Sequence, residues 1–504
     1  MRRFFPLLLI LGCLCLSCKH GSDAPRKGNP VLRMGVDSVG GSIVVLNLEL
    51  LNAEYAFCKA VPASEAAPSA EALGKSGIRL EAGRQRLEGL SPETDYVAYA
   101  CAAADEVLGS VQSVSFRTMV SEASLYDWER SRNGIPDFAD LVLLYGLWRR
   151  DASGKVLTWS EERIAPLVSW TDAEGREHWL FDAFLALEGC NADGSRSFMI
   201  GTHENGSSQA RRACTKADAQ AFIDWWMGSG NGFSAIDKAI GDAATRMGAP
   251  AVRRYAIMMM PDIPVNERYD DRSSSTTYWG EVDGVKLDFG RTADRLRAYQ
   301  WYVDEVRRRF DEAGFSNLEL GGFYPLTEEL PTTRAGLPGQ GEVGMDGWEQ
   351  QYKRWDDIFP ALSDYIHQYK QSVVWIPYRN AAGYRYTSEL GLDYVFMQPN
   401  RLWNSDARYN MADFFETISA FGLGMELEFD DNILSGRANS DTYQARWREY
   451  VDGMRENGVY GSRRFALYQD TDSFNHFRLS GNARDREIYD ELCELVSGNP
   501  LKAK

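Results

Sequence analysis

The sequence has few histidines and lacks the short motifs of several common enzyme classes. Only five histidines occur in 504 residues, and no His-Glu-x-x-His motif is present, which argues against a zinc hydrolase. No Cys-x-x-Cys pair follows Cys18, so structural zinc and thioredoxin chemistry are not expected. No Gly-x-Ser-x-Gly occurs, and no Gly-x-Gly-x-x-Gly follows a strand, which argues against a nucleophile-elbow hydrolase and a dinucleotide enzyme. We therefore expect neither a cofactor nor a metal.

Positive charge is also scarce. The formal net charge is −17, and no basic run interleaved with aromatic residues offsets it. A chain this acidic repels phosphate backbones, so we expect no nucleic-acid partner. Apolar residues make up 44% and charged residues 25%, which excludes a wholly disordered chain, and the length predicts two or more domains.

The only marked apolar run near the amino terminus is too short to span a bilayer. Arg2 and Arg3 precede the apolar segment 7–16, and Ser17 comes directly before Cys18. This pattern resembles a lipoprotein signal, with residues 1–18 as the signal peptide and Cys18 as the lipidated residue. Residues 19–30 then form a polar tether, and the protein is expected to be lipid-anchored to the outer membrane, at the cell surface or facing the periplasm. An ordinary secretory signal is the alternative.

Five cysteines remain after Cys18. They are well separated along the chain, and the sequence leaves both disulfides and buried thiols open, with buried thiols slightly favoured. The five are Cys58, Cys101, Cys190, Cys214 and Cys493.

Residues 31–119 alternate short apolar runs with Gly, Pro and Ser clusters and show no long helical period. The runs 43–46, 55–57 and 96–100 are examples. This spacing predicts an all-β sandwich. The segment 87–96, which ends in Tyr96, resembles the tyrosine corner of fibronectin type III domains, and 114–118 resembles their last strand. Such domains are spacers or binding modules, so no catalysis is assigned here. The fragment 74–76 (Gly-Lys-Ser) is not a phosphate loop, because Ser69 stands where its first glycine is required.

From residue 121 to residue 497, apolar strand-like runs alternate with amphipathic helical stretches. Helical spacing is clear at 295–310, 348–366 and 488–495. Eight strand–helix units predict a closed (β/α)8 barrel, with a doubly wound open sheet as the alternative. Residues 146–178 show no clear helix, and extra strands are an option there. The predicted strands are 141–145, 179–187, 254–260, 318–324, 373–377, 394–397, 425–429 and 465–468.

Acids, amides and aromatic residues gather where the fourth to eighth predicted strands end. In such barrels the chemistry lies at the carboxyl ends of the strands. The aromatic residues suit a carbohydrate cleft, although core packing is the alternative for each of them. The predicted substrate-binding residues are Tyr324, Trp375, Tyr378, Arg379, Gln398, Asn400, Trp403, Tyr468 and Asp470.

The seventh predicted strand carries the most informative pattern. A period of two puts Glu426, Glu428 and Asp430 on one side and apolar residues on the other, so the acids are expected to face the barrel axis. Repulsion and desolvation then raise the pKa of at least one carboxyl group, as a general acid requires. Glu328 follows the fourth strand and supplies the second carboxylate that glycoside hydrolysis needs. Alternatively, a core ion network satisfies the inward acids, and Glu328 is an exposed loop acid.

Several segments together are similar to a bacterial family called domain of unknown function 4855. These include 128–130, 140–146, 179–185, Gly322-Phe323-Tyr324 with Glu328, and 424–429. The resemblance spans roughly residues 121–497 and implies a barrel like that of glycoside hydrolases. Pro325 stands where the family's Phe-Tyr-Trp-x-x-Glu pattern has tryptophan, which puts that stacking platform in question but not the carboxylate.

The sequence therefore predicts a surface-anchored glycoside hydrolase acting on a polysaccharide or glycan. Glu328 is expected to be the general acid/base, and Glu428, nearer the mouth than Glu426, is favoured as the nucleophile of a retaining reaction. A non-catalytic glycan-binding lipoprotein is the alternative. The expected partners are a carbohydrate substrate, the membrane through the lipid anchor, and neighbouring glycan-uptake proteins.

Overall fold

The chain forms two compact units, and the larger one includes Phe116–Lys504. Three segments named above fall outside the part that the structure describes: the signal with Cys18, the predicted boundary at 119–121, and 128–130. The computed structural model describes residues 29–39, 44–91, 94–104, 107–118, 134–150, 154–199, 212–263, 278–330, 358–381, 383–384, 387, 390–406 and 409–503.

The amino-terminal region consists of two separate β-sheets. One has the order β1-β2-β5, and the other has the order β4-β3-β6-β7 with β8 paired to β6. An all-β region was predicted here, and strands are confirmed at all the predicted runs. The strands are β1 (Val31–Val39), β2 (Val44–Leu51), β3 (Tyr55–Pro62), β4 (Ile78–Leu80), β5 (Gly83–Leu87), β6 (Asp95–Ala104), β7 (Val107–Leu108) and β8 (Gln112–Arg117).

One short helix in this region was not predicted. Helix α1 (Ala70–Ser76) begins after Ser69, whose hydroxyl accepts a hydrogen bond from the amide of Ala72. The Gly-Lys-Ser fragment therefore forms the last turn of a capped helix.

Eight parallel strands form a closed barrel in the larger unit. They follow one another in the order β12-β15-β18-β19-β20-β21-β22-β9. The barrel closes where Phe465 aligns with Asp140. All eight predicted strands are confirmed, and closure excludes the open sheet. The strands are β9 (Asp140–Tyr145), β12 (Ala183–Leu187), β15 (Arg254–Met260), β18 (Leu318–Pro325), β19 (Ser372–Trp375), β20 (Tyr394–Met397), β21 (Gly424–Glu428) and β22 (Phe465–Tyr468).

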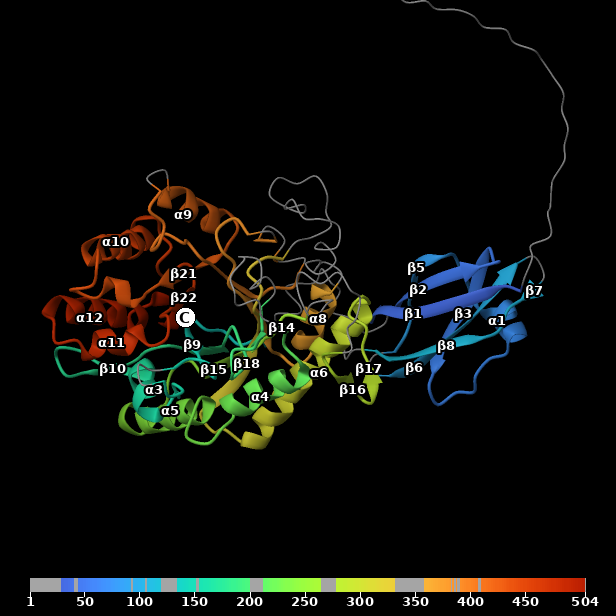
Figure 1. The fold of residues 1–504 in the computed structure, drawn as a ribbon, viewed down its shortest axis with the longest axis horizontal. Coiled ribbons are helices and arrows are strands. Elements are labelled where there is room, and N and C mark those ends of the chain that lie inside the picture. Colours follow the sequence, from blue (N-terminus) through green and yellow to red (C-terminus); the bar gives the residue numbers. More distant parts are fainter. Residues whose placement is uncertain are drawn as a thin grey trace, which may run out of the picture. The chain divides into compact units, whose positions relative to one another are not determined.

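Helices surround these strands (Figure 1). The long helix predicted at 295–310 is confirmed as α6, with its predicted apolar face buried. The helix predicted at 488–495 lies within α12. The carboxyl half of the helix predicted at 348–366 is α8, and its first half lies outside the described residues. The helices are α3 (Glu161–Val168), α4 (Lys216–Trp226), α5 (Phe233–Met247), α6 (Thr292–Ala313), α8 (Phe359–His367), α9 (Met411–Ala420), α10 (Ser440–Glu456), α11 (Ser473–Leu479) and α12 (Ala483–Ser497), with 3-10 turns η2 (Asp431–Ile433) and η3 (Pro500–Ala503).

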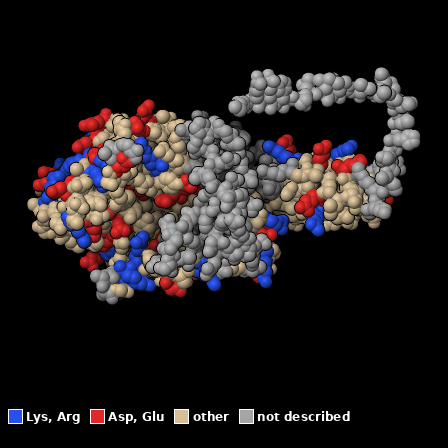
Figure 2. Space-filling model, turned by 45° about the horizontal axis from the view of Figure 1, so that its top comes forward, with Lys and Arg blue, Asp and Glu red and all other residues tan. Residues whose placement is uncertain are grey.

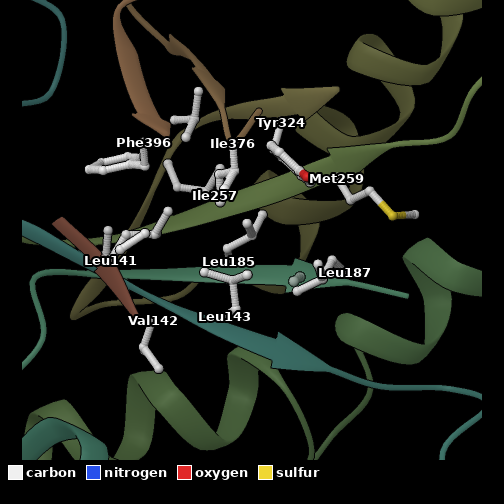
Figure 3. Close-up of a cluster of buried hydrophobic side chains, with 14 of the residues drawn as sticks. Leu141, Val142, Leu143, Leu185, Leu187, Ile257, Met259, Tyr324, Ile376 and Phe396 are labelled. Atoms are coloured by element: carbon white, nitrogen blue, oxygen red, sulfur yellow. The ribbon is translucent and has the colours of Figure 1, made fainter. Parts of the chain in front are cut away.

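The barrel interior is an apolar core, because alternate residues of each strand turn inward. Figure 3 shows Leu143 and Leu185 turned toward Ile257, whereas Val142 points the other way, toward helices. These side chains are almost completely buried. Each buried side chain of this size contributes about 1.5–3 kcal/mol to folding. These inward-facing side chains therefore form an apolar centre of the barrel.

A β-bulge in β18 decides which residue of that strand faces the interior. Between β15 and β18, the partners of Ala256 and Ile257 jump from Leu320 to Gly322, so Gly321 is an extra residue. A Cβ on Gly321 would lie 2.7 Å from the Cβ of Tyr255, so only glycine fits there. The bulge shifts the alternation by one residue and puts Tyr324 in register with Met259, on the inner side.

The weakest part of the sequence prediction was residues 146–178. Extra strands occur there as considered: β10 (Ser169–Thr171) and β11 (Glu177–Trp179) pair antiparallel. Helix α3 was missed, and it is short and contains Pro166. The second barrel strand begins at Ala183 rather than at Trp179. Asp182 breaks the run, because its amide donates to the Asp140 carboxylate instead of to a strand.

The five cysteines of the described residues are buried thiols rather than disulfides. Burial raises the pKa of the Cys58 thiol to about 12, so it stays protonated and unreactive at neutral pH.

Three short pairs of strands lie outside the barrel wall in the larger unit. Besides the β10–β11 hairpin, they are β13 (Arg196–Ser197) with β14 (Arg212–Ala213) and β16 (Glu281–Val282) with β17 (Val285–Lys286).

Candidate functional site

A cavity of about 290 Å³ opens at the carboxyl ends of the barrel strands. Its lining combines two carboxylates, one guanidinium, four aromatic side chains and an amide with an apolar floor. Residues on or directly after seven of the eight strands contribute, as a barrel active site requires. The lining residues are Leu143, Tyr145, Arg149, Leu187, Gly189, Met199, Tyr324, Leu326, Glu328, Ile376, Gln398, Trp403, Glu426 and Tyr468.

Glu328 enters the cavity from the segment after β18. Its Oε1 accepts a hydrogen bond of 2.7 Å from Nε2 of Gln398, which also donates to the carbonyl of Ile376 at 3.1 Å. Burial raises the pKa of Glu328, the Gln398 hydrogen bond lowers it, and the nearby charge of Glu329 raises it. Glu328 is therefore a partly buried carboxyl group with one donor that favours its ionised form.

Glu426 lies on β21 and is 4% exposed. Burial first, and then the charges of Glu428 and Glu328, raise its pKa well above the usual value. No hydrogen bond joins its carboxyl group to another residue of the described part of the chain. Nothing there offsets its burial, so the surroundings of Glu426 favour its protonated form.

Glu428 lies on the same strand but outside the cavity lining. Its Oε1 accepts from the amide of Asn400 at 2.5 Å, and its Oε2 accepts from the amide of Leu402 at 3.0 Å and from the Tyr450 hydroxyl. Burial raises its pKa to about 7, against the lowering effect of these three donors. Glu428 therefore ties the segment after β20 and helix α10 to the barrel.

The inward and outward sides of β21 agree with its sequence pattern. Glu426 faces the cavity, whereas the ring of Phe429, just after the strand, packs against two helices. Its centroid lies 5.1 Å from that of the Trp447 ring of α10 and 4.5 Å from that of the Phe477 ring of α11. Asp430 accepts from Nε1 of Trp403 at 2.8 Å and from the amide of Asn432 at 2.9 Å. The three acids of one side thus have three different surroundings.

Aromatic rings form one wall of the cavity. Trp403 is 42% exposed, and its ring meets Tyr468 edge to face at 5.6 Å. Tyr468 meets Tyr145 in the same way at 6.0 Å. Tyr324, turned inward by the bulge, lies beside Glu328 and Glu426, and burial first, then these two acids, raise its pKa well above the usual value. An exposed indole beside half-buried tyrosines is a suitable surface for a sugar ring.

Five of the predicted substrate-binding residues do not line the cavity. Trp375 is fully buried, and its Nε1 donates to the carbonyl of Thr327 at 2.8 Å. Asn400, at φ 54°, takes part through its backbone amide. The other three also lie outside the lining. The Tyr378 hydroxyl donates to Glu329, the guanidinium carbon of Arg379 lies 4.4 Å from the centroid of the Tyr409 ring, and Asp470 adopts φ 47°.

The first two barrel strands also contribute to the site, which was not predicted because the candidate residues came only from the ends of strands four to eight. Tyr145 and Arg149 follow from β9, and Glu188 follows directly after β12. The guanidinium carbon of Arg149 lies 4.7 Å from the centroid of the Tyr145 ring, and its Nε lies 3.6 Å from Oε2 of Glu188. Burial raises the pKa of Glu188 to about 7. An acid directly after a predicted strand was the available signal.

Among the described residues, no group of three or more histidine, cysteine or acidic side chains is arranged to hold a metal ion. In the same part of the chain, no helix has the length and apolar composition needed to cross a bilayer.

Comparison with known families decides the relationship of the barrel. The family described as Domain of unknown function (DUF4855) matches residues 140–339 and 345–494. The chain belongs to this family. The matched segments include all eight strands and both cavity carboxylates, so the DUF4855 region and the barrel coincide. No curated protein matches the chain.

Three solved structures each match about a fifth of the chain. The fn3 domain of human collagen alpha-1(XX) chain is 19% identical over 21% of this chain and 98% of its own, with a TM-score of 0.16. A redesigned β-sandwich protein is 17% identical over 19% of this chain and 93% of its own, at 0.15. The FN1–FN3 domains of chicken CNTN1 are 15% identical over 18% of this chain and 32% of their own, at 0.15.

Proposed function

We propose that this protein is a glycoside hydrolase acting on a polysaccharide or glycan. The observation that carries the proposal is the pair Glu328 and Glu426, which reach one cavity from different strands of a closed barrel. Glycosidic bonds are cleaved by two such carboxyl groups, one as a proton donor and the other as a carboxylate. The aromatic wall supplies the stacking surface that a sugar needs.

The two carboxyl groups have unequal surroundings, which assigns their roles. Glu426 accepts no hydrogen bond from the described residues, and its raised pKa makes it the proton donor. Glu328 accepts from Gln398 and is the ionised partner. Glu328 was expected to be the general acid/base and is now proposed as the carboxylate. Glu426 replaces Glu428 as the second catalytic residue, because Glu428 lies outside the lining and accepts hydrogen bonds from three donors.

We expect the reaction to retain the anomeric configuration, with Glu328 as nucleophile. The expectation comes from the position of the pair after the fourth and seventh strands of the barrel. Carboxyl groups about 5–5.5 Å apart favour retention, and a gap of about 6.5–9.5 Å favours inversion through a water molecule. Proton NMR of the first product formed distinguishes the two outcomes.

The test is a glycan panel in which released reducing ends are measured for the wild type, Glu328→Gln and Glu426→Gln. On any glycan that the wild type cleaves, each variant should lose about 10²–10⁴-fold in turnover. Glu487→Gln, which changes an exposed acid of α12 paired with Arg484, is the control and should keep its rate. Near wild-type rates in both glutamine variants would contradict the proposal. Binding of a glycan without cleavage would favour the non-catalytic binding protein.

We further propose a lipid-anchored, two-part architecture. Cys18 carries the lipid, residues 19–30 form the tether, and residues 31–119 form a fibronectin type III-like sandwich that spaces a (β/α)8-type barrel from the outer membrane. Glycan-uptake proteins are the proposed neighbours. In a Gram-negative host the protein should take up labelled fatty acid, and Cys18→Ser should abolish the label. Label retained in Cys18→Ser would refute the anchor.

A further inference from the structure

The cavity contains one cation that the proposed cleavage does not use. Arg149 follows β9 and is the only basic residue among the cavity's described lining residues. In the barrel order β9 stands between β22 and β12, whereas Glu328 and Glu426 come from β18 and β21. The guanidinium therefore reaches the cavity from a different part of the wall than the carboxylate pair.

Arg149 does not serve as the counter-ion of that pair. Burial and neighbouring carboxylates or amides account for the shifted pKa of Glu328 and of Glu426, with no contribution from a cation. Its nearest acid is Glu188, whose Oε2 lies 3.6 Å from Nε, beyond hydrogen-bond length. Both of these atoms are buried and have no hydrogen-bond partner among the described residues.

Stacking holds the Arg149 side chain in place instead. Its guanidinium carbon lies 4.7 Å from the Tyr145 ring centroid and 5.9 Å from that of Trp148. The side chain is 31% exposed, so its outer N–H groups can be reached from the cavity. A guanidinium oriented by aromatic rings, with donors to spare, is suited to bidentate binding of an oxyanion.

We infer that the sugar bound in this cavity carries an anionic oxygen group, the carboxylate of a uronic acid or a sulfate ester, and that Arg149 recognises it. The inference rests on the proposed function and adds its substrate class. Recognition must be local, because the chain has a net charge of −17 and would repel a polyanion at long range. On the face shown in Figure 2, basic and acidic side chains are interspersed rather than gathered into a basic patch.

The test measures binding to the full chain by calorimetry, using sugars that differ only at C6. The methyl glycosides of glucose, glucuronic acid and glucose 6-sulfate form one set, and the galactose equivalents form a second. We expect an acidic member of one set to bind about 10- to 100-fold more tightly than its neutral counterpart, the range for a hydrogen bond to a charged group. The carboxylate and sulfate members separate the two sources of the anion.

Variants of Arg149 and Glu188 test the mechanism. Arg149→Gln should remove the preference for the acidic sugar over its neutral counterpart. Arg149→Lys keeps the positive charge without the planar guanidinium, so it should keep part of the preference for the acidic sugar. It replaces Arg149→Gln as the test if that variant proves unstable. Glu188→Gln removes the acid that competes for the guanidinium, and should strengthen acidic-sugar binding. Equal binding of acidic and neutral sugars, or a preference that survives Arg149→Gln, overturns the inference.

The outcomes separate this inference from the hydrolase proposal. Acidic-sugar binding through Arg149 without cleavage of any glycan would refute the hydrolase and leave the inference standing. Cleavage of neutral glycans that depends on Glu426, without any preference for acidic sugars, would support the hydrolase and overturn the inference. Failure of every acidic sugar to bind at millimolar concentration would overturn the inference.

Discussion

At the amino end of the barrel, two buried carboxylates lie beside two buried cations. Nζ of Lys502, from turn η3, lies 2.9 Å from Asp140 Oδ2 and 3.3 Å from Asp182 Oδ1, and Arg254 lies 2.9 Å from the same Asp182 oxygen. At the carboxyl end, Glu426 and Glu428 are buried and Glu328 is partly buried, with no cation in direct contact among the described residues. Glu428 has three uncharged donors, Glu328 has one, and Glu426 has none.

The comparison indicates that a buried carboxyl group has a different role at each end of the barrel. Where matched cations and backbone amides surround the carboxylates, the cluster stabilises one arrangement of three strands and the carboxyl terminus. Burial raises the pKa of a carboxyl group at both ends, to about 7 for Asp140 despite the nearby Lys502, so a raised pKa alone does not distinguish the two ends. What distinguishes Glu426 is that no hydrogen bond and no cation of the described residues offsets its burial. A carboxylate at the end of a barrel strand is therefore informative only together with its partners.

The largest effect on stability is expected at the amino end. Asp182→Asn keeps the shape of the side chain but leaves Arg254 and Lys502 short of negative charge in a buried site. Loss of one member of a buried ion pair costs about 3–5 kcal/mol of unfolding free energy. Urea unfolding of the two proteins measures the difference, and turnover of the folded variant should stay unchanged.

The matched control is Glu319→Gln at the same end. Glu319 pairs with Arg253, but both side chains are exposed, at 47% and 71%. An exposed pair contributes about 0–1 kcal/mol. Equal losses in Asp182→Asn and Glu319→Gln would mean that the buried cluster has no special role.

The sequence predicted the barrel well because its strands are continuous apolar runs long enough to recognise. It did not predict the ion cluster, since Lys502 joins Asp140 across almost the whole barrel sequence. It also did not choose between Glu426 and Glu428, because both have the same parity on β21. That choice depends on donors from other elements, namely Tyr450 on α10 and the amides of Asn400 and Leu402.

A smaller and opposite effect is expected for Glu426→Gln. A carboxyl group whose pKa is raised on folding binds more protons in the folded than in the unfolded state. The folded state therefore loses stability as pH rises above the unfolded pKa, about 4.5 for Glu. Glutamine cannot ionise, so the variant escapes this loss. We expect similar stability at pH 4.5 and a gain of about 0.5–2 kcal/mol at pH 8.

Thermal or urea unfolding at the two pH values measures this effect. Glu487→Gln, an exposed acid paired with Arg484, serves as the control and should show no gain at pH 8. A loss of stability in Glu426→Gln that grows with pH would show that Glu426 is ionised and paired, and would remove it as the proton donor.

The smallest effect separates the two cavity acids from each other. Gln398 donates to Glu328 and lowers its pKa, so Gln398→Leu should raise that pKa by about 1 unit, equivalent to the loss of one hydrogen bond to a charged group. If ionised Glu328 is required, the acidic limb of the pH–rate profile moves to higher pH by the same amount, while the rate on the plateau changes less. The acidic limb reports the ionisation of both coupled cavity acids. In a Glu426→Gln background that retains measurable turnover, Gln398→Leu should therefore move the limb in the same direction but by less. Glu487→Gln, which changes an exposed acid of α12, should leave the limb in place. A limb that stays fixed in Gln398→Leu, or moves to lower pH, would mean that Glu328 is not the group whose ionisation the reaction needs, and would return the nucleophile role to β21.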